Sequence, residues 1–240
     1  MLPALQALPR ADVLAFGAHP DDLEIGCAGT LLRLGQLGRS CVLVDASAGE
    51  KGSQGDAASR AAEATAAAAR LGARARGNLG LRDTAMRDDD DSADRLVAVL
   101  RAVQPQLFLV PFGEDRHPDH VAAAAIAHRA TFLAGLRNHR PELGARHRPR
   151  LVLAYAGNHS FEPSLVVDIS AVVDAKAEVL RCFRSQIAPP APAGQPPTVD
   201  VLDRAQVRDR YHGARIGSIA GEAYWHAGPL PVRDLAALLG

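Results

Sequence analysis

Short apolar runs alternate with longer segments of helical periodicity along most of the chain. The runs contain four or five apolar residues without a helical period, which is typical of buried strands. They lie at residues 13–17, 41–44, 107–110, 151–155 and 165–169. Helices are predicted from about residue 22 to Gly35 or Gly38, at 56–71, 92–103 and 118–136, and between 198 and 211.

This alternation predicts a Rossmann-like, doubly wound α/β fold. Fully apolar strands separated by helices indicate a mostly parallel sheet that is covered by helices on both faces. The Pro-rich residues 188–197 are too few for an interdomain linker of any length, and we expect them to form a surface loop. We therefore expect a single domain over residues 1–240.

The composition excludes several classes of protein. Hydrophobic residues make up 48% of the chain and charged residues 22%, as in ordinary globular proteins. Lys and Arg together number 27 and are balanced by 27 Asp and Glu, so no nucleic-acid or membrane partner is predicted. No apolar stretch approaches the ~20 residues of a spanning helix, and the start of the chain does not read as a signal peptide, so we expect a cytoplasmic protein.

The cysteines carry no recognisable chemistry. Cys27, Cys41 and Cys182 are odd in number and far apart, and none belongs to a CxxC motif. This pattern favours buried free thiols over a disulfide framework or a cysteine zinc cluster.

Histidines and aspartates follow two of the predicted strands. His19-Pro20-Asp21-Asp22 comes after the strand at 13–17, and His117-Pro118-Asp119-His120 comes after the strand at 107–110. Ligands of open parallel sheets bind outside the carboxyl ends of the strands, so both segments belong to the expected site.

The two segments offer the ligands of a catalytic metal ion. His19 and Asp22 are three residues apart, so a tight turn can bring both onto one ion, and His117 or His120 can supply a third ligand. Three ligands of His and carboxylate type, with one position left to water, are typical of catalytic zinc, although Fe²⁺ or another divalent ion fits as well. Asp21 lies beside these ligands and can act as general base toward the water.

Each segment alone has a simpler interpretation. Asp21 and Asp22 can cap a helix N-terminus, and Pro118 suits the first position of a helix that follows His117. The presence of both segments after strands that are expected to be neighbours favours the metal site.

The same segments resemble a known family, the PIG-L/LmbE-like zinc-dependent N-deacetylases. Its motifs read AHPDD after the first strand and HPDH later, as residues 18–22 and 117–120 do here. Further likeness lies at residues 24–26, 29–30, 49–52, 60, 63, 167–170, 176, 185–186 and 213–224. The chain is most similar to the bacillithiol-biosynthesis branch, which removes acetate from N-acetylglucosaminyl malate.

The resemblance assigns a role to each residue of the motifs. It implies that His19, Asp22 and His120 bind zinc, and that Asp21 is the base that deprotonates the attacking water. It implies that His117 is held by Asp119 and stabilises the oxyanion or protonates the leaving amine. Arg60 matches the family's arginine that contacts the substrate.

The resemblance also implies the partners. We expect a small-molecule substrate, an acetylated amino-sugar conjugate, and a homo-oligomer, either a trimer or a hexamer. Two alternatives remain open: a deacetylase of another amidated sugar, such as a mycothiol-type or antibiotic precursor, and a non-catalytic sugar-binding module.

Other features are assigned no site. Asp88–Asp91 are more typical of a solvated helix cap than of a cation site. Without the resemblance, Arg60 would be interpreted as a surface ion pair with Glu63 on one helix face. The sequence gives no function to His159, His212 and His226 or to the Arg-rich residues 137–150.

Overall fold

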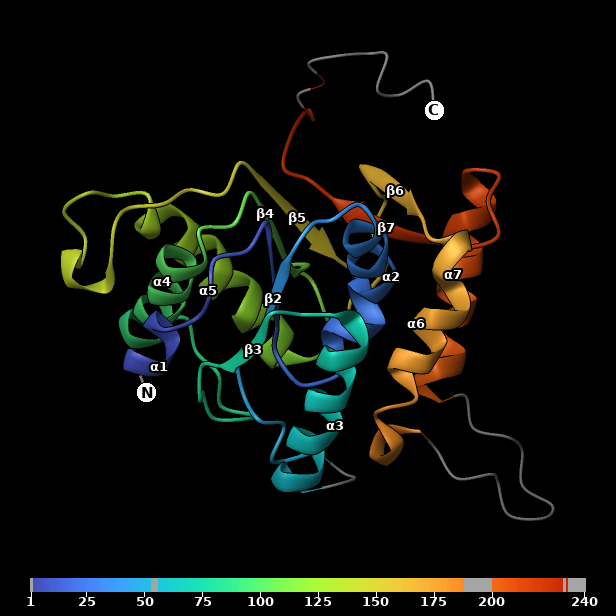
Figure 1. Cartoon of the computed structure of the whole chain (residues 1–240), viewed down its shortest axis with the longest axis horizontal. Coiled ribbons are helices and arrows are strands. Elements are labelled where there is room, and N and C mark those ends of the chain that lie inside the picture. Colours follow the sequence, from blue (N-terminus) through green and yellow to red (C-terminus); the bar gives the residue numbers. More distant parts are fainter. Residues whose placement is uncertain (1, 53–55, 188–199, 231, 233–240) are drawn as a thin grey trace.

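Seven strands form one sheet in the order β3-β2-β1-β4-β5-β7-β6 in the computed structural model, which describes residues 2–52, 56–187, 200–230 and 232 (Figure 1). The strands are β1 (Val13–Gly17), β2 (Cys41–Asp45), β3 (Ala75–Asn78), β4 (Leu107–Pro111), β5 (Leu151–Tyr155), β6 (Leu165–Asp168) and β7 (Gly221–Trp225). The pairs from β3 through β5 are parallel, whereas β7 is antiparallel to both β5 and β6. The predicted α/β fold with a mostly parallel sheet is confirmed.

Helices cover both faces of the sheet. The helices are α1 (Leu2–Gln6), α2 (Asp22–Gln36), α3 (Ala57–Leu71), α4 (Asp90–Val103), α5 (Pro118–Ala134), α6 (Val173–Leu180) and α7 (Val201–Arg215). In Figure 1, α1, α4 and α5 lie on one side of the sheet, and α2, α3, α6 and α7 lie on the other. None of the described helices is long and apolar enough to cross a membrane.

The strand β1 shows why the buried strands are apolar without interruption. Leu14 and Phe16 belong to the core beneath α4 and α5, while Val13 and Ala15 belong to the core beneath α2 and α3. Because successive side chains of a strand point to opposite faces, a strand covered on both faces needs apolar residues at every position.

Local signals set the helix boundaries. The side chain of Asp56 accepts a hydrogen bond from the backbone N–H of Ser59 and caps α3, which ends at Gly72 with a φ of +68°. Asp89 caps α4 in the same way through Ser92, so the acidic residues 88–91 form a helix N-terminus, as expected.

Two strands and two α-helices were not predicted from the pattern: β3, β7, α1 and α6. β3 and β7 carry charged residues at positions that the sheet buries partly or fully. Arg76 of β3 donates to Asp45 and Glu24, and Glu222 of β7 pairs with Lys176. These partners are remote in sequence, so the apolar pattern gives no sign of them. The Pro-rich residues 188–197 lie outside the described residues, and the single domain over 1–240 stays a prediction.

The strand order places the two His-Asp segments together. β1 pairs with β2 on one side and with β4 on the other, so the chain direction across the sheet reverses between β1 and β4. A crevice forms at such a switch point outside the carboxyl ends of the two strands. Residues 19–22 follow β1 there, and residues 117–120 follow β4.

Candidate metal centre and active site

The loop after β1 positions Asp22 at the first turn of α2. One carboxylate oxygen of Asp22, Oδ2, accepts hydrogen bonds from the backbone N–H groups of Ala18 (3.1 Å) and His19 (2.9 Å). These bonds fix the side chain against its own loop. The other oxygen, Oδ1, therefore faces the segment that follows β4.

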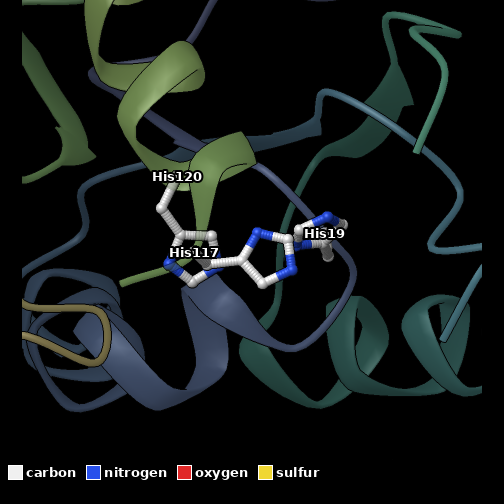
Figure 2. A group of neighbouring side chains, drawn as sticks. All are labelled: His19, His117 and His120. Carbon is white, nitrogen blue, oxygen red and sulfur yellow. The ribbon is translucent and has the colours of Figure 1, made fainter. Parts of the chain in front are cut away.

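Three histidines meet at this point (Figure 2). His19 comes from the loop after β1, and His117 and His120 come from the start of α5, with His117 at the N-cap and Pro118 at the first helical position. Each of the three offers a ring nitrogen, and these nitrogens lie within 4.8 Å of one another. Proximity alone does not decide which two histidines bind a metal ion.

One ring nitrogen of His19 faces Asp22, and the other faces two further carboxylates. Nδ1 of His19 lies 3.6 Å from Oδ2 of Asp22, and Nε2 lies 3.2 Å from a carboxylate oxygen of Asp119 and 3.2 Å from one of Asp83. A carboxylate on the far nitrogen fixes the tautomer and the ring orientation, as it does for many metal-binding histidines.

His120 is arranged in the same way, but with the roles of its two ring nitrogens exchanged. Its Nε2 lies 3.3 Å from Oδ1 of Asp22, and its Nδ1 lies 3.2 Å from Oδ2 of Asp115. Both histidines thus direct one nitrogen to Asp22 and the other to a buried carboxylate. His19, Asp22 and His120 together fit a divalent ion that accepts two imidazoles and one carboxylate.

The charge around the two rings favours a cation. Burial lowers the pKa of each imidazole, but the neighbouring carboxylates, Asp22 foremost, raise the pKa of His19 and of His120 to about 9. Without a metal ion the centre therefore takes up protons, and a metal ion has to displace them. A second possible ligand group, His19 with Asp83 and Asp119, shares His19 with the first and uses its other nitrogen.

His117 differs from the other two because its Nδ1 is already used. It accepts a hydrogen bond of 3.2 Å from the backbone N–H of Asp119. Partial burial and the positive charges of His19 and His120 lower the pKa of His117. A neutral ring that accepts at Nδ1 carries its proton on Nε2, so His117 offers a hydrogen-bond donor next to the candidate ligands.

The resemblance implies that Asp119 holds His117, and in the structure the backbone N–H of Asp119 contacts that ring, while its carboxylate makes other contacts. Its carboxylate accepts hydrogen bonds from the backbone N–H groups of Thr84 (2.7 Å) and Met86 (3.4 Å) and contacts Nε2 of His19. Asp119 lies on the first turn of α5 and points inward toward the loop after β3. The structure therefore connects this carboxylate to His19, a candidate metal ligand.

Asp21 lies beside Asp22 in an unusual backbone conformation. Its φ is +113°, which is uncommon for a residue other than glycine, and such strain is found at functional sites more than elsewhere. Burial and the charge of Asp22 raise the pKa of Asp21 to about 7, although Arg60 opposes the shift from 3.2 Å away. A carboxyl group with this pKa can exchange protons near neutral pH, as a general base must.

Arg60 is buried behind Asp21. Its guanidinium donates to the backbone carbonyl of Pro20 and forms an ion pair with Asp21, and 4% of the residue is exposed. The alternative interpretation of Arg60 as a surface ion-pair partner of Glu63 is wrong, because Glu63 accepts hydrogen bonds from the backbone N–H and the hydroxyl of Ser185. The polar contacts of the Arg60 side chain are with the Asp21 loop, and its contact with substrate stays a prediction.

Two carboxylates of the site were missed by the sequence reasoning. Asp83 follows β3, a strand that the pattern did not predict. Asp115 lies within the predicted loop, two residues before His117, and accepts from the backbone N–H of His117 and of Asn158. The closeness of Asp115 to the HPDH motif is the one signal that could have identified it.

Known proteins resemble the chain in sequence and in structure. The model of the family PIG-L, described as GlcNAc-PI de-N-acetylase, matches residues 14–131. A diacetylchitobiose deacetylase from Thermococcus kodakarensis is 31% identical over 185 residues, which cover 72% of this chain and 69% of that protein. A 1D-myo-inositol 2-acetamido-2-deoxy-alpha-D-glucopyranoside deacetylase from Streptomyces avermitilis is 30% identical, covering 76% of this chain and 85% of that protein. Among solved structures, the conserved protein TT1542 from Thermus thermophilus superposes with a TM-score of 0.84 and 36% identity over 92% of this chain and 97% of that one.

Proposed function

Because this chain belongs to the PIG-L family of N-deacetylases, we propose that it hydrolyses the acetamide group of an N-acetylglucosamine conjugate with the help of a zinc ion. The observation that carries the proposal is the arrangement around Asp22. Two histidines direct one nitrogen each toward this carboxylate, and the other nitrogen of each is held by a buried carboxylate.

His19, Asp22 and His120 are the residues proposed to hold the ion. When bound, a divalent ion acts as a Lewis acid that makes water a better nucleophile and polarises the amide carbonyl. Fe²⁺ and other divalent ions accept the same ligands, so zinc is the metal to test first.

Asp21 and His117 supply the proton transfers that amide hydrolysis requires. Asp21 takes a proton from the attacking water, for which its buried position and raised pKa suit it. Nε2–H of His117 donates a hydrogen bond to the oxygen on which negative charge develops, because Nδ1 is occupied by the backbone of Asp119. The leaving amine must be protonated, and Asp21, once protonated, and His117 are the groups proposed to supply that proton.

The group attached to the sugar is the finer part of the proposal. The sequence resemblance favours N-acetylglucosaminyl malate, whereas one relative is named for an inositol conjugate and another for diacetylchitobiose. A sugar conjugate with malate is therefore the first substrate to test, and one with inositol is the second. The cytoplasmic location and the trimeric or hexameric assembly stay predictions.

The test is a comparison of acetate release by the zinc-loaded protein from three compounds. These are N-acetylglucosaminyl malate, N-acetylglucosaminyl inositol and free N-acetylglucosamine. We expect release from at least one conjugate at a higher kcat/KM than from the free sugar. Binding of all three without release would instead support a sugar-binding module and contradict the proposal.

A further inference from the structure

A cavity opens beside the metal centre, and most of its wall has no part in the chemistry described above. It has a volume of about 680 Å³, within the usual range for pockets that bind small molecules. Asp22 and His120 contribute to its lining, so the cavity is continuous with the proposed reaction centre. A substrate whose acetamide lies at the centre has room in this cavity for the rest of the molecule.

One wall of the cavity is a face of α7. Arg204, Arg208 and Tyr211 line it and are spaced by four and three residues, so they lie on one side of the helix. Another part of the lining comes from the loops after β4 and β5 and includes Arg116 and Asn158. Three arginines from two separate parts of the chain therefore face one cavity.

Among the residues that line the cavity, few carboxylates oppose the charge of these arginines. Asp22 is the one carboxylate among the lining residues, and His19 and His120 already contact it. Arg208 donates to the backbone carbonyls of three residues, and none of the described carboxylates forms an ion pair with it. The three carbonyls belong to Ile25, Ala156 and Gly157.

The side chains of the other two arginines have fewer polar contacts than that of Arg208. Arg116 donates to the side-chain oxygen of Asn158, which is neutral. The side chain of Arg204 forms no hydrogen bond or ion pair within the described part of the chain. Arg215, two turns of α7 beyond Arg208, shows the contrast, because it pairs with Glu162 and lies outside the cavity lining.

The geometry points to an anion-binding subsite for the group attached to the sugar, formed by Arg116, Arg204 and Arg208. This inference rests on the proposed function, because it takes the reacting acetamide to lie at Asp22 and His120. A guanidinium binds carboxylate or phosphate oxygens through two parallel hydrogen bonds, which neither an inositol nor a second sugar can match in charge. The substrate class is therefore an N-acetylglucosamine conjugate whose aglycone carries a carboxylate or a phosphate.

The test compares anionic and neutral conjugates in variants of the exposed arginines. The substrates are N-acetylglucosaminyl malate, N-acetylglucosamine 1-phosphate and N-acetylglucosaminyl inositol. The variants are Arg204→Gln and Arg116→Gln, and the matched control is Arg210→Gln, an exposed arginine of α7 outside the cavity lining. Arg208 is left intact because it also holds three backbone carbonyls.

We expect each variant to lower kcat/KM for the preferred anionic conjugate about tenfold, as the loss of a charged hydrogen bond does. The inositol conjugate should change by less than about twofold, and the control should match wild type for all substrates. The first two substrates separate carboxylate from phosphate recognition. Equal use of inositol and anionic conjugates by wild type, or an equal loss for all three in both variants, would overturn the subsite.

A binding measurement keeps this inference separate from the proposed function. If no conjugate releases acetate, calorimetry with glucosaminyl malate and glucosamine tests the subsite without turnover. The subsite predicts tighter binding of the malate compound, weakened by Arg204→Gln and by added NaCl. Equal affinity for the two compounds would reject it.

Discussion

At the scale of single residues, neighbouring carboxylates in the centre have different partners and therefore different roles. Asp22 is fixed by two backbone N–H groups and faces two histidines, whereas Asp21, the next residue back, faces Arg60. Burial raises the pKa of Asp21 to about 7, while the contacts with His120 and His19 overcome burial and keep the pKa of Asp22 well below its usual value. A charged Asp22 suits a metal ligand, and a titratable Asp21 suits a base.

The two aspartates are therefore expected to respond differently to substitution. Asp21→Asn should retain bound zinc and lower kcat by about 10²- to 10⁴-fold, because the base is removed and the ligands remain. Asp22→Ala should lose the zinc and the activity together. Metal analysis of the dialysed proteins, read beside acetate release, checks both outcomes. Equal metal loss in the two variants would contradict the role given to Asp21.

Asp119 gives a second prediction at this scale, because its carboxylate contacts His19, whereas its backbone N–H contacts the ring of His117. Asp119→Asn should weaken zinc binding about 10- to 100-fold, as the loss of a carboxylate behind a ligand histidine does. Competition with a chelating dye measures the affinity, and Asp91→Asn on the exposed start of α4 is the control. An unchanged zinc affinity with a lower kcat would instead indicate that Asp119 acts through His117.

At the scale of elements, α2 carries the proposed ligand Asp22 and has to lie close to the sheet. Gly26 faces the ring of Tyr155 on β5, and a Cβ atom at Gly26 would lie 2.2 Å from Cδ2 of that ring. Tyr155 has little freedom to move away, because its hydroxyl donates to the backbone carbonyl of Phe16 at 2.9 Å. A glycine inside the helix thus permits the close approach that sets the position of the helix.

Two glycines of α2 are expected to respond in opposite directions to alanine. Gly26→Ala should lower the free energy of unfolding by about 1–3 kcal/mol through overpacking against Tyr155. Gly35→Ala, where nothing lies within 4 Å of an added Cβ, should raise it by about 0.5 kcal/mol, because alanine favours the helix. Urea denaturation of both variants measures the difference. Destabilisation by both substitutions to the same extent would show that close packing at Gly26 is not the cause.

The elements also show what could be predicted from the sequence. β1, β2, β4 and β5 are apolar at nearly every position, so their pattern alone identified them. The order of β1 and β4 then followed from the rules of parallel sheets and brought His19 and His120 together. Asp83 could not be placed, because it follows β3, whose Arg76 is buried through ion pairs with residues 31 and 52 positions away. The direction of a side chain such as Asp119 likewise depends on loops that no local pattern reveals.

At the scale of the whole molecule, a buried ion cluster joins the C-terminal elements to α2. Lys176 of α6 lies 2.8 Å from a carboxylate oxygen of Asp209 on α7 and 2.6 Å from one of Glu222 on β7. Glu222 also accepts from the backbone N–H groups of Gly29 and Thr30. The cluster fixes α7, and with it the arginine wall of the cavity, relative to the helix that carries Asp22.

The cluster should make stability depend on pH in the acid range. Burial alone would raise the pKa of Glu222, but Lys176 and the bonds from Thr30 lower it below the usual 4.5. A lowered pKa in the folded state means that this stabilisation is present above pH 4.5 and is lost as the pH falls through the folded value. Glu222→Gln should cost about 3 kcal/mol near pH 7, since it breaks a buried pair, and progressively less below pH 4.

Chemical denaturation of wild type and Glu222→Gln between pH 3 and 7 checks this prediction. The control is Glu178→Gln, because Glu178 is half exposed on α6 and pairs with Arg181 at the surface, where an ion pair contributes little. A difference between wild type and Glu222→Gln that stays constant over the whole range would contradict the lowered pKa.

The central claim is that His19, Asp22 and His120 bind a divalent ion on which the hydrolysis of an acetamide depends. The most direct test is acetate release from N-acetylglucosaminyl malate and N-acetylglucosaminyl inositol by metal-stripped protein as zinc is added back. We predict almost no release without metal and full recovery near one zinc per chain. Release that is independent of zinc, or one bound zinc per chain with no release from either conjugate, would contradict the claim.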